Sequence, residues 1–314
     1  MKKKLLALLA LVSSTGMAFW APYEPNVAWT KRTIRTCFGG PEHQSLSLLD
    51  SVDRNVTRYT AKEKQIIKDF INKEFTQDSV GLNFSGWQDC NATASNGDLI
   101  VFKDEISLEG EGHIVMRGGA ASVGERGSVI HRWDEDTRQT YPEMAKSSTK
   151  LLPLVILNTT VASQKKVSSE EYLQLTAIHE FGHVAGLRHE HVRMEDAKKD
   201  PNCKKATNIP LKTDPLYSST HFSGDYDANS VMNYCYFNSL LDVTGTKFRA
   251  KVISDELVLT DPSIYSTKEV KTMFGQIRTE VSIRIGLSHL DKEAIRCLYK
   301  YEGETKKNLC SRKI

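Results

Sequence analysis

The sequence of 314 residues lacks a strong net charge, a pair of closely spaced cysteines and any internal repeat. Its 42 lysines and arginines nearly balance 39 aspartates and glutamates, and the basic residues do not cluster with aromatic ones. This pattern does not predict a nucleic-acid interface. None of the six cysteines forms a CxxC pair, so a zinc site built from thiolates is not expected. With 39% hydrophobic residues, the chain can bury the core of one large domain or of two lobes.

The chain also has no apolar run near its start that is long enough to cross a bilayer, which takes roughly 20 residues. Three lysines precede an apolar run of eight residues, Leu5 to Val12, and small residues follow up to Ala18. This order is typical of a secretory signal peptide that is cut after Ala18. We therefore expect a signal peptide over residues 1–18 and a secreted protein, extracellular or periplasmic, without a stable membrane anchor.

The cysteines are even in number, and export places them in an oxidising compartment. We therefore expect them to form disulfides. Fifteen pairings are possible for six cysteines. Our prediction is sequential pairing, because each bond then lies within one region of the chain. This pairing joins Cys37 to Cys90, Cys203 to Cys235 and Cys297 to Cys310.

Hydrophobic periodicity predicts strands and helices that are mixed along the chain. The expected strands are 31–38, 81–87, 98–104 and, as a central strand, the very apolar segment 151–158. The Gly-rich stretch that follows residue 108 holds candidate edge strands at 112–119 and 122–133. The expected helices are 60–75, 169–186 and 288–301. Ser168 and Glu171 form a capping box that marks the start of the second helix.

Four histidines and two glutamates lie within thirteen positions, HEFGHVAGLRHEH, residues 179–191. His179 and His183 are four residues apart on the expected helix, so both imidazoles project from one face. Gly186 ends the helix, and the chain can then bring His189 to the same point. Three neutral imidazole ligands leave the fourth tetrahedral position of zinc open, which is typical of a catalytic site. The pattern HExxHxxGxxH arises by chance in on the order of one such chain in ten thousand or fewer.

This motif resembles that of the metzincin zinc peptidases. The residues after it resemble the astacin-type continuation, with Glu190, Arg193 and Asp196 behind the third histidine. Downstream, YDANSVMNYC at residues 226–235 resembles the Met-turn of the family, with Met232 as the base beneath the zinc. The resemblance covers most of residues 29–301.

The resemblance implies an α+β, metzincin-type, two-lobed zinc peptidase. Its N-terminal lobe holds a twisted mixed sheet with two long helices, and its C-terminal lobe is irregular and ends in a helix. The implied organisation is a catalytic domain at 19–302 between the signal peptide and a basic tail at 303–314. Residues 236–286 are longer than in compact members of the family. We interpret them as a surface insertion, with a role in substrate access as the alternative.

The resemblance also implies metal-assisted hydrolysis of peptide bonds. Zinc held by the three histidines lowers the pKa of its water and polarises the scissile carbonyl, while Glu180 moves a proton from water to the departing amine. Tyr234 is expected to donate a hydrogen bond to the oxyanion of the transition state. The alternative for Tyr234 is a core aromatic that holds the turn. A protein or peptide substrate is expected to lie along an edge strand within residues 113–133 of a monomeric enzyme.

Two other functions stay open from the sequence. A secreted zinc-dependent adhesion or binding protein needs the ligands but not the base Glu180, whose presence argues against it. A cell-wall peptide hydrolase would use the same residues on a different bond. His191 is expected to face solvent, because a fourth imidazole would close the open position of the metal.

Overall fold

The computed structural model describes most of the predicted elements. The described residues are 28–46, 56–104, 119–121, 129–134, 139–144, 152–158, 168–190, 194–200, 203, 226–236, 249–250, 262, 264–271, 277–302, 305 and 310. The predicted signal peptide lies outside them, as does the tail from Gly303 except for Thr305 and Cys310. Within these residues, every helix is too short or too polar to cross a membrane.

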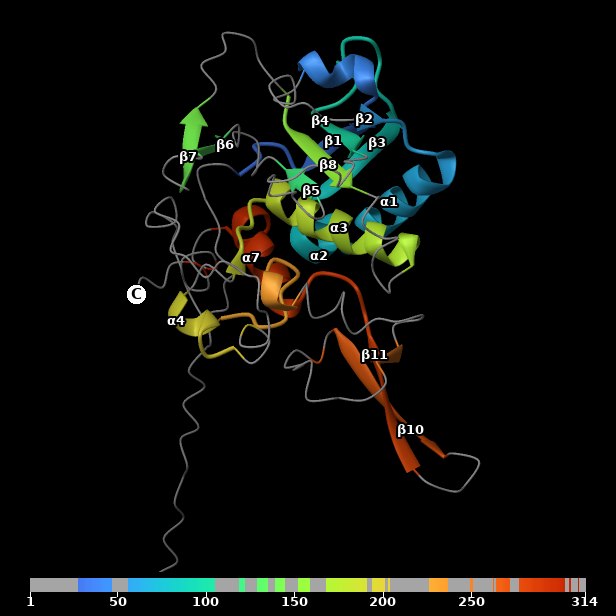
Figure 1. Ribbon diagram of the computed structural model, residues 1–314, viewed down its shortest axis with the longest axis vertical. Coiled ribbons are helices and arrows are strands. Elements are labelled where there is room, and N and C mark those ends of the chain that lie inside the picture. The colour runs from blue at the N-terminus through green and yellow to red at the C-terminus, as the bar shows by residue number, and fades with distance from the viewer. Residues whose placement is uncertain are drawn as a thin grey trace, which may run out of the picture.

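A mixed sheet forms the upper part of the molecule (Figure 1). Its strands are β1 (Thr33–Phe38), β2 (Val56–Thr57), β3 (Asn83–Asp89), β4 (Leu99–Asp104), β5 (Gly119–Ala121) and β8 (Leu154–Asn158). The order is β3-β1-β4-β8-β5, with β2 beside β4. The first four of these strands run parallel, and β5 is antiparallel to β8 at one edge. The four strands predicted at 31–38, 81–87, 98–104 and 151–158 therefore lie in one sheet, with β8 in its interior.

Two long helices pack on this sheet, as predicted (Figure 1). They are α1 (Ala61–Glu74) and α3 (Ser169–Val184), and the shorter helices nearby are η2 (Pro41–Leu46) and α2 (Gln77–Val80). The capping box of Ser168 and Glu171 is present at the start of α3. Aromatic rings fill the space between sheet and helix, because the ring of Phe181 in α3 lies 4.8 Å from that of Phe84 and 5.8 Å from that of Trp87 in β3. The mixed α+β fold is thus confirmed.

The C-terminal part is more regular than predicted. Its elements are α4 (Met194–Ala197), β9 (Arg249–Ala250), β10 (Tyr265–Lys271), β11 (Ile277–Ile283) and α7 (His289–Tyr299). The three strands form an antiparallel sheet in the order β10-β11-β9, and β10 and β11 project away from the main sheet (Figure 1). The expectation of an irregular lobe is corrected here, because apolar and polar residues alternate from Ile277 to Ile283 with the period of a strand. The final helix is confirmed.

A second correction concerns the candidate edge strand at 122–133. Strand β6 (Val129–Asp134) pairs with β7 (Gln139–Met144) in a separate two-stranded sheet instead of joining the main one. Strand β7 was not predicted. Of the other candidate, 112–119, only Gly119 is among the described residues, and it begins β5, the edge strand of the main sheet.

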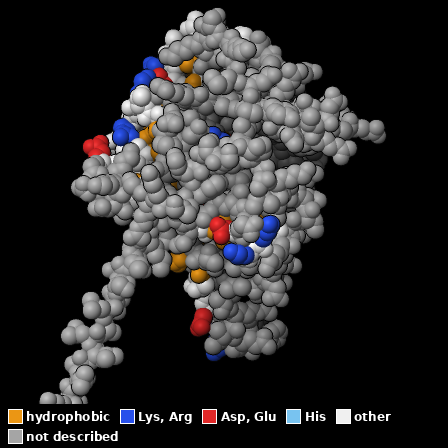
Figure 2. All heavy atoms as spheres, turned by 90° about the vertical axis from the view of Figure 1, so that its left-hand side faces the viewer, with side chains coloured by type: hydrophobic (Ala, Val, Ile, Leu, Met, Phe, Trp, Pro, Cys, Tyr) orange, Lys and Arg blue, Asp and Glu red, His pale blue; other side chains and the backbone are white. Residues whose placement is uncertain are grey.

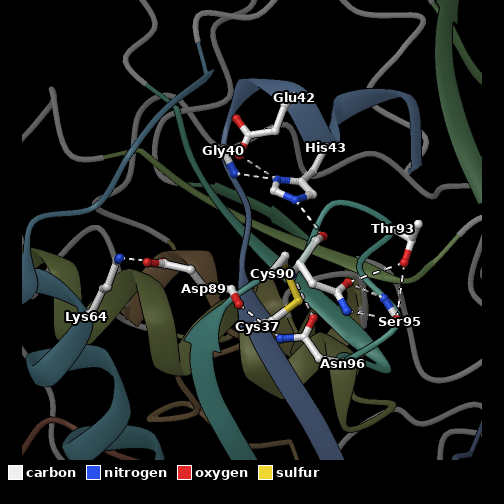
Figure 3. The surroundings of a disulfide bond; sticks show 11 residues. Cys37, Gly40, Glu42, His43, Lys64, Asp89, Cys90, Thr93, Ser95 and Asn96 are labelled. Carbon is white, nitrogen blue, oxygen red and sulfur yellow. Dashed lines mark hydrogen bonds and ion pairs between the residues drawn. A yellow bond between two sulfur atoms is a disulfide. The ribbon is translucent and has the colours of Figure 1, made fainter.

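The three disulfides are those of the predicted sequential pairing, and no cysteine of the chain is left over. The first, Cys37–Cys90, ties β1 to the loop after β3 (Figure 3). Above it, the buried ring of His43 accepts a hydrogen bond from the backbone of Gly40 and donates one to the carbonyl of Asn91. The bond between Cys297 and Cys310 fastens part of the tail to α7.

Charged side chains of both signs are interspersed on the face drawn in Figure 2, so the described ones form no single-sign patch there. Asp98 is a carboxylate with two cationic partners. Asp98 lies 2.8 Å from Lys31 Nζ and 3.0 Å from Arg35 Nη2, and its side chain is only 12% exposed. Burial alone would raise the pKa of Asp98, but the hydrogen bonds from Arg35 and Lys31 outweigh it and hold that pKa well below its usual range.

A carboxylate with a lowered pKa stabilises the folded state above its unfolded pKa, near 4, and loses that contribution as the pH falls through its folded pKa. We therefore expect Asp98→Asn to melt at a lower temperature than the parent at pH 7, with the gap narrowing as the pH falls below about 4. Thermal unfolding at pH 7 and at a pH below about 4 measures the difference in melting temperature between Asp98→Asn and the parent. Asp89→Asn, which removes a carboxylate that is 56% exposed and paired with Lys64, is the control and should change the melting temperature little. A gap for Asp98→Asn that is independent of pH would contradict this assignment.

Candidate metal centre

Helix α3 is buried on almost all sides in its second half. Every residue from Leu175 to Val184 is buried, and among them His179, Glu180 and His183 are 3%, 4% and 8% exposed. Polar side chains at such positions are costly unless they have partners. The helix therefore carries three polar side chains into the interior. The sequence predicted only that His179 and His183 share one face of the helix.

Two backbone carbonyls orient the helical histidines. His179 Nδ1 lies 2.7 Å from the carbonyl of Val231, and His183 Nδ1 lies 2.9 Å from that of Leu187. A carbonyl only accepts, so each Nδ1 must carry the proton. The Nε2 atom of each neutral ring is then left with a lone pair, which is the state in which imidazole binds a metal.

The Nε2 atoms of all three histidines converge. That of His189 lies 3.2 Å from His179 Nε2 and 3.0 Å from His183 Nε2. His189 Nε2 has at most one proton to share between two lone pairs, whereas a cation at the centre satisfies all three nitrogens at once. Tetrahedral zinc with bonds of 2.0–2.1 Å holds its ligand nitrogens about 3.3 Å apart, close to the distances seen here. The residues present therefore fit a zinc ion, and among the described residues they are the only such group.

A left-handed turn brings the third histidine back. Gly186 has φ of +97°, a conformation that strains residues with a side chain, and a Cβ there would lie 2.9 Å from Leu298 of α7. The backbone N–H of Leu187 then bonds the carbonyl of Gly182. The prediction that α3 stops at this glycine is confirmed within two residues, because the helix ends at Val184.

Met232 lies directly against α3 and is fully buried. A Cβ at Gly182 would come 2.6 Å from the sulfur of Met232, so the helix can approach the Met-turn only because that residue is glycine. The carbonyl of Met232 accepts a hydrogen bond from the backbone of Glu190, next to the third histidine. The structure thus brings the two sequence motifs together, and Gly182 is a supporting residue that the sequence reading missed.

Tyr234 lies beside the histidines and is partly buried. Its ring centroid is 4.3 Å from that of His189 and 5.4 Å from that of His179. The neighbouring side chain, Asn233, is fully buried and donates to the hydroxyl of Tyr226 at 2.8 Å and to the carboxylate of Asp200 at 3.2 Å. This pair of bonds holds the backbone from which Tyr234 projects.

The partners of Asn233 also interact with each other. The hydroxyl of Tyr226 donates to Asp200 at 2.8 Å, and burial together with this negative charge raises the pKa of Tyr226 far above its usual value. The disulfide Cys203–Cys235 closes the same region, since Cys235 directly follows Tyr234. The turn that carries Tyr234 is therefore tied down on both sides.

A buried hydrogen-bond network connects the Met-turn to α7. The hydroxyl of Ser230 donates to Asp291 at 2.6 Å, and that of Ser288 donates to Asp227 at 2.5 Å. The backbone N–H of Asp227 in turn bonds Glu190 Oε1 at 2.9 Å. Burial raises the pKa of Asp291, while the bonds from the two serines act in the opposite direction. Glu190 is thus a structural link between the third histidine and the C-terminal helix.

Arg193 and His191 lie outside the described residues, and Asp196 lies in α4, where its carbonyl accepts hydrogen bonds from Lys199 and Asp200. Of the predicted substrate segment 113–133, only residues 119–121 and 129–133 are described.

Comparisons with known proteins add little at the level of sequence. No protein-family model matches the chain, and no curated protein matches it. Among solved structures, the chain is similar to one described as the structure of myroilysin, with 14% sequence identity and a TM-score of 0.41. The alignment covers 90% of this chain and 100% of that one.

We expect the purified protein to hold one zinc ion per chain, because three neutral imidazoles converge on one point. Elemental analysis measures this. His183→Ala should lose the ion, whereas His43→Ala, the same change at a buried histidine beside the first disulfide, should retain it. Equal zinc content in the two variants would contradict the assignment of the ligands.

Proposed function

We propose that the chain is a secreted zinc metalloendopeptidase of the metzincin type, with astacin-like features. The observation that carries this proposal is the convergence of the three Nε2 atoms of an HExxHxxGxxH motif beside a tyrosine of the Met-turn. Three disulfides are consistent with export to an oxidising compartment. The two-lobed architecture, the monomeric state and the astacin-like label are parts of the same proposal.

Zinc, when bound, supplies Lewis acidity that polarises the scissile carbonyl and makes water a nucleophile near neutral pH. The chain provides the rest. The rings of His179 and His183 are fixed in direction, because the carbonyls of Val231 and Leu187 accept hydrogen bonds from their Nδ1 atoms, and this leaves Nε2 of each neutral ring to bind the metal. Glu180 lies between the two histidines in the sequence and is buried. It accepts the proton of the attacking water and delivers it to the departing amine. The Tyr234 hydroxyl donates a hydrogen bond to the oxyanion of the tetrahedral carbon.

The substrate in this proposal is an extended peptide paired with β5. This strand lies at the edge of the main sheet, antiparallel to β8, and it contacts α3, which carries the helical histidines. Backbone pairing at a sheet edge accepts many sequences, while side-chain pockets select among them. The alternative functions differ from this proposal in the substrate that the protein hydrolyses, or in whether it hydrolyses any substrate. Casein and purified peptidoglycan, each assayed with and without chelator, separate an endopeptidase from a cell-wall peptide hydrolase and from a zinc-binding protein without turnover.

We expect Glu180→Ala to retain zinc and the parent's melting temperature and to lose on the order of 10²–10⁴-fold in kcat, because it removes a base without removing a ligand. Casein turnover and zinc content measure the two effects. Glu170→Ala, at an exposed position on the same helix, is the control and should leave both unchanged. Turnover by Glu180→Ala within a few-fold of the parent would refute the mechanism.

We expect Tyr234→Phe to lower kcat by about 10²–10³-fold with little change in KM, because it keeps the ring and removes a donor that acts in the transition state. Tyr236→Phe makes the same change at a fully buried tyrosine two residues further on and should leave kcat close to the parent's. If Tyr234→Phe loses stability or zinc instead of kcat, the tyrosine is a core aromatic that holds the turn.

A further inference from the structure

One of the last backbone carbonyls of α3 accepts a hydrogen bond from a tryptophan that is distant in the sequence. A helix leaves its final four carbonyls without partners inside the helix, so each of them must bond elsewhere when it is buried. The turn after α3 provides for three of them, since Ala185, Leu187 and Gly186 donate to residues 181, 182 and 183. The fourth carbonyl, that of Val184, accepts a hydrogen bond of 2.8 Å from the indole N–H of Trp29, which is 155 positions earlier in the chain.

Trp29 belongs to the segment 29–32 that precedes β1, called the arm below, and this arm makes two sets of contacts. Its side chain is 4% exposed and packs in the main core, and its backbone N–H donates to the hydroxyl of Tyr299 at 3.2 Å. Three residues on, the Arg32 guanidinium lies 5.4 Å above the ring of Tyr299 and donates to the carbonyl of Leu298. The arm is therefore fastened to α7, and its indole reaches from there to the end of α3.

The carbonyl of Val184 lies at the start of residues 184–188, which connect the two histidines of α3 to His189 and are called the junction below. His183 precedes it by one residue, and His189 follows it by five. The same short turn contains the Leu187 carbonyl that orients the ring of His183. A change in the direction of this junction moves His189 relative to His179 and His183, and a metal site tolerates such displacement poorly because its ligands must meet at one point.

We propose that Trp29 is a positioning residue of the metal centre, whose indole N–H sets the junction between the helical histidines and His189. The inference rests on the proposed metal site. It adds that the arm around Trp29 belongs to the functional core, although it is far from the motif in sequence.

Trp87 provides a matched control. It is also a buried tryptophan, 8% exposed, and its indole donates to Asn72 of α1 and to the carbonyl of Phe84 instead of to α3. Trp29→Phe and Trp87→Phe therefore remove the same donor and a similar volume. Loss of packing affects both variants, whereas loss of the bond to the junction affects only the first.

Two measurements distinguish the variants. The first is the zinc dissociation constant of the folded protein, from competition with a chelator of known affinity. We expect it to rise about tenfold in Trp29→Phe, the lower end of what lost support of metal ligands costs, and to stay at the parent's value in Trp87→Phe. The second is hydrogen exchange of the metal-free protein, in which residues 182–190 should exchange faster in Trp29→Phe only. Equal dissociation constants, or equal exchange of this segment, in the two variants would overturn the inference.

The design also covers two complications. If Trp29→Phe does not fold, Tyr299→Phe decides, because it removes only the hydroxyl that accepts from the backbone of the arm. It should shift both readouts in the same direction and by less, and no shift in either would overturn the inference. If the parent binds no zinc, the proposed function fails, while the exchange of residues 182–190 in the metal-free variants still tests whether Trp29 holds the junction.

Discussion

Three imidazole lone pairs that face one another inside the protein are the constraint on which the rest of the structure depends. His189 Nε2 has at most one proton to share with the Nε2 atoms of His179 and His183, whereas a cation at the centre interacts with all three nitrogens at once. The arrangement also requires rigid support, since two of the rings are aimed by carbonyls of different segments, Val231 and Leu187. The half of α3 that bears His179 and His183 is accordingly buried, and α3 packs against β8, β5 and α1 and against the side chain of Met232.

This packing explains several local choices in the chain. Gly182 allows Met232 to lie against the helix, and Gly186 turns the chain with a φ of +97°, which strains residues that have a side chain. The network of Ser230, Asp291 and Ser288 then holds α7 and the Met-turn together without solvent. These contacts act on the backbone that carries the ligands, so the histidines are positioned by residues that do not touch them.

The sequence predicted most of the regular elements because their periodicity is local. The capping boxes and apolar faces of α1 and α3 are within one helix each, and the disulfide pairs were predicted because each joins nearby regions. The sequence does not predict the β10–β11 hairpin, although residues 277–283 alternate, because the partner strand β10 has the mostly polar sequence YSTKEVK and lacks an apolar face. Strand β6 was placed in the wrong sheet, because a strand's own residues do not identify its neighbour.

The sequence alone determined the spacing of His179, Glu180, His183 and His189, because helical geometry and the glycine stop act over a few residues. It singled out Met232 and Tyr234 only through the resemblance of their segment to a family motif. Only the tertiary structure decided what aims and supports the histidines. The carbonyls of Val231 and Leu187 carry no side-chain signal, and the bond from Trp29 to Val184 spans 155 positions. Every residue has a carbonyl, so which of them orients a ring is settled by packing between distant segments, and no pattern within one segment contains that information.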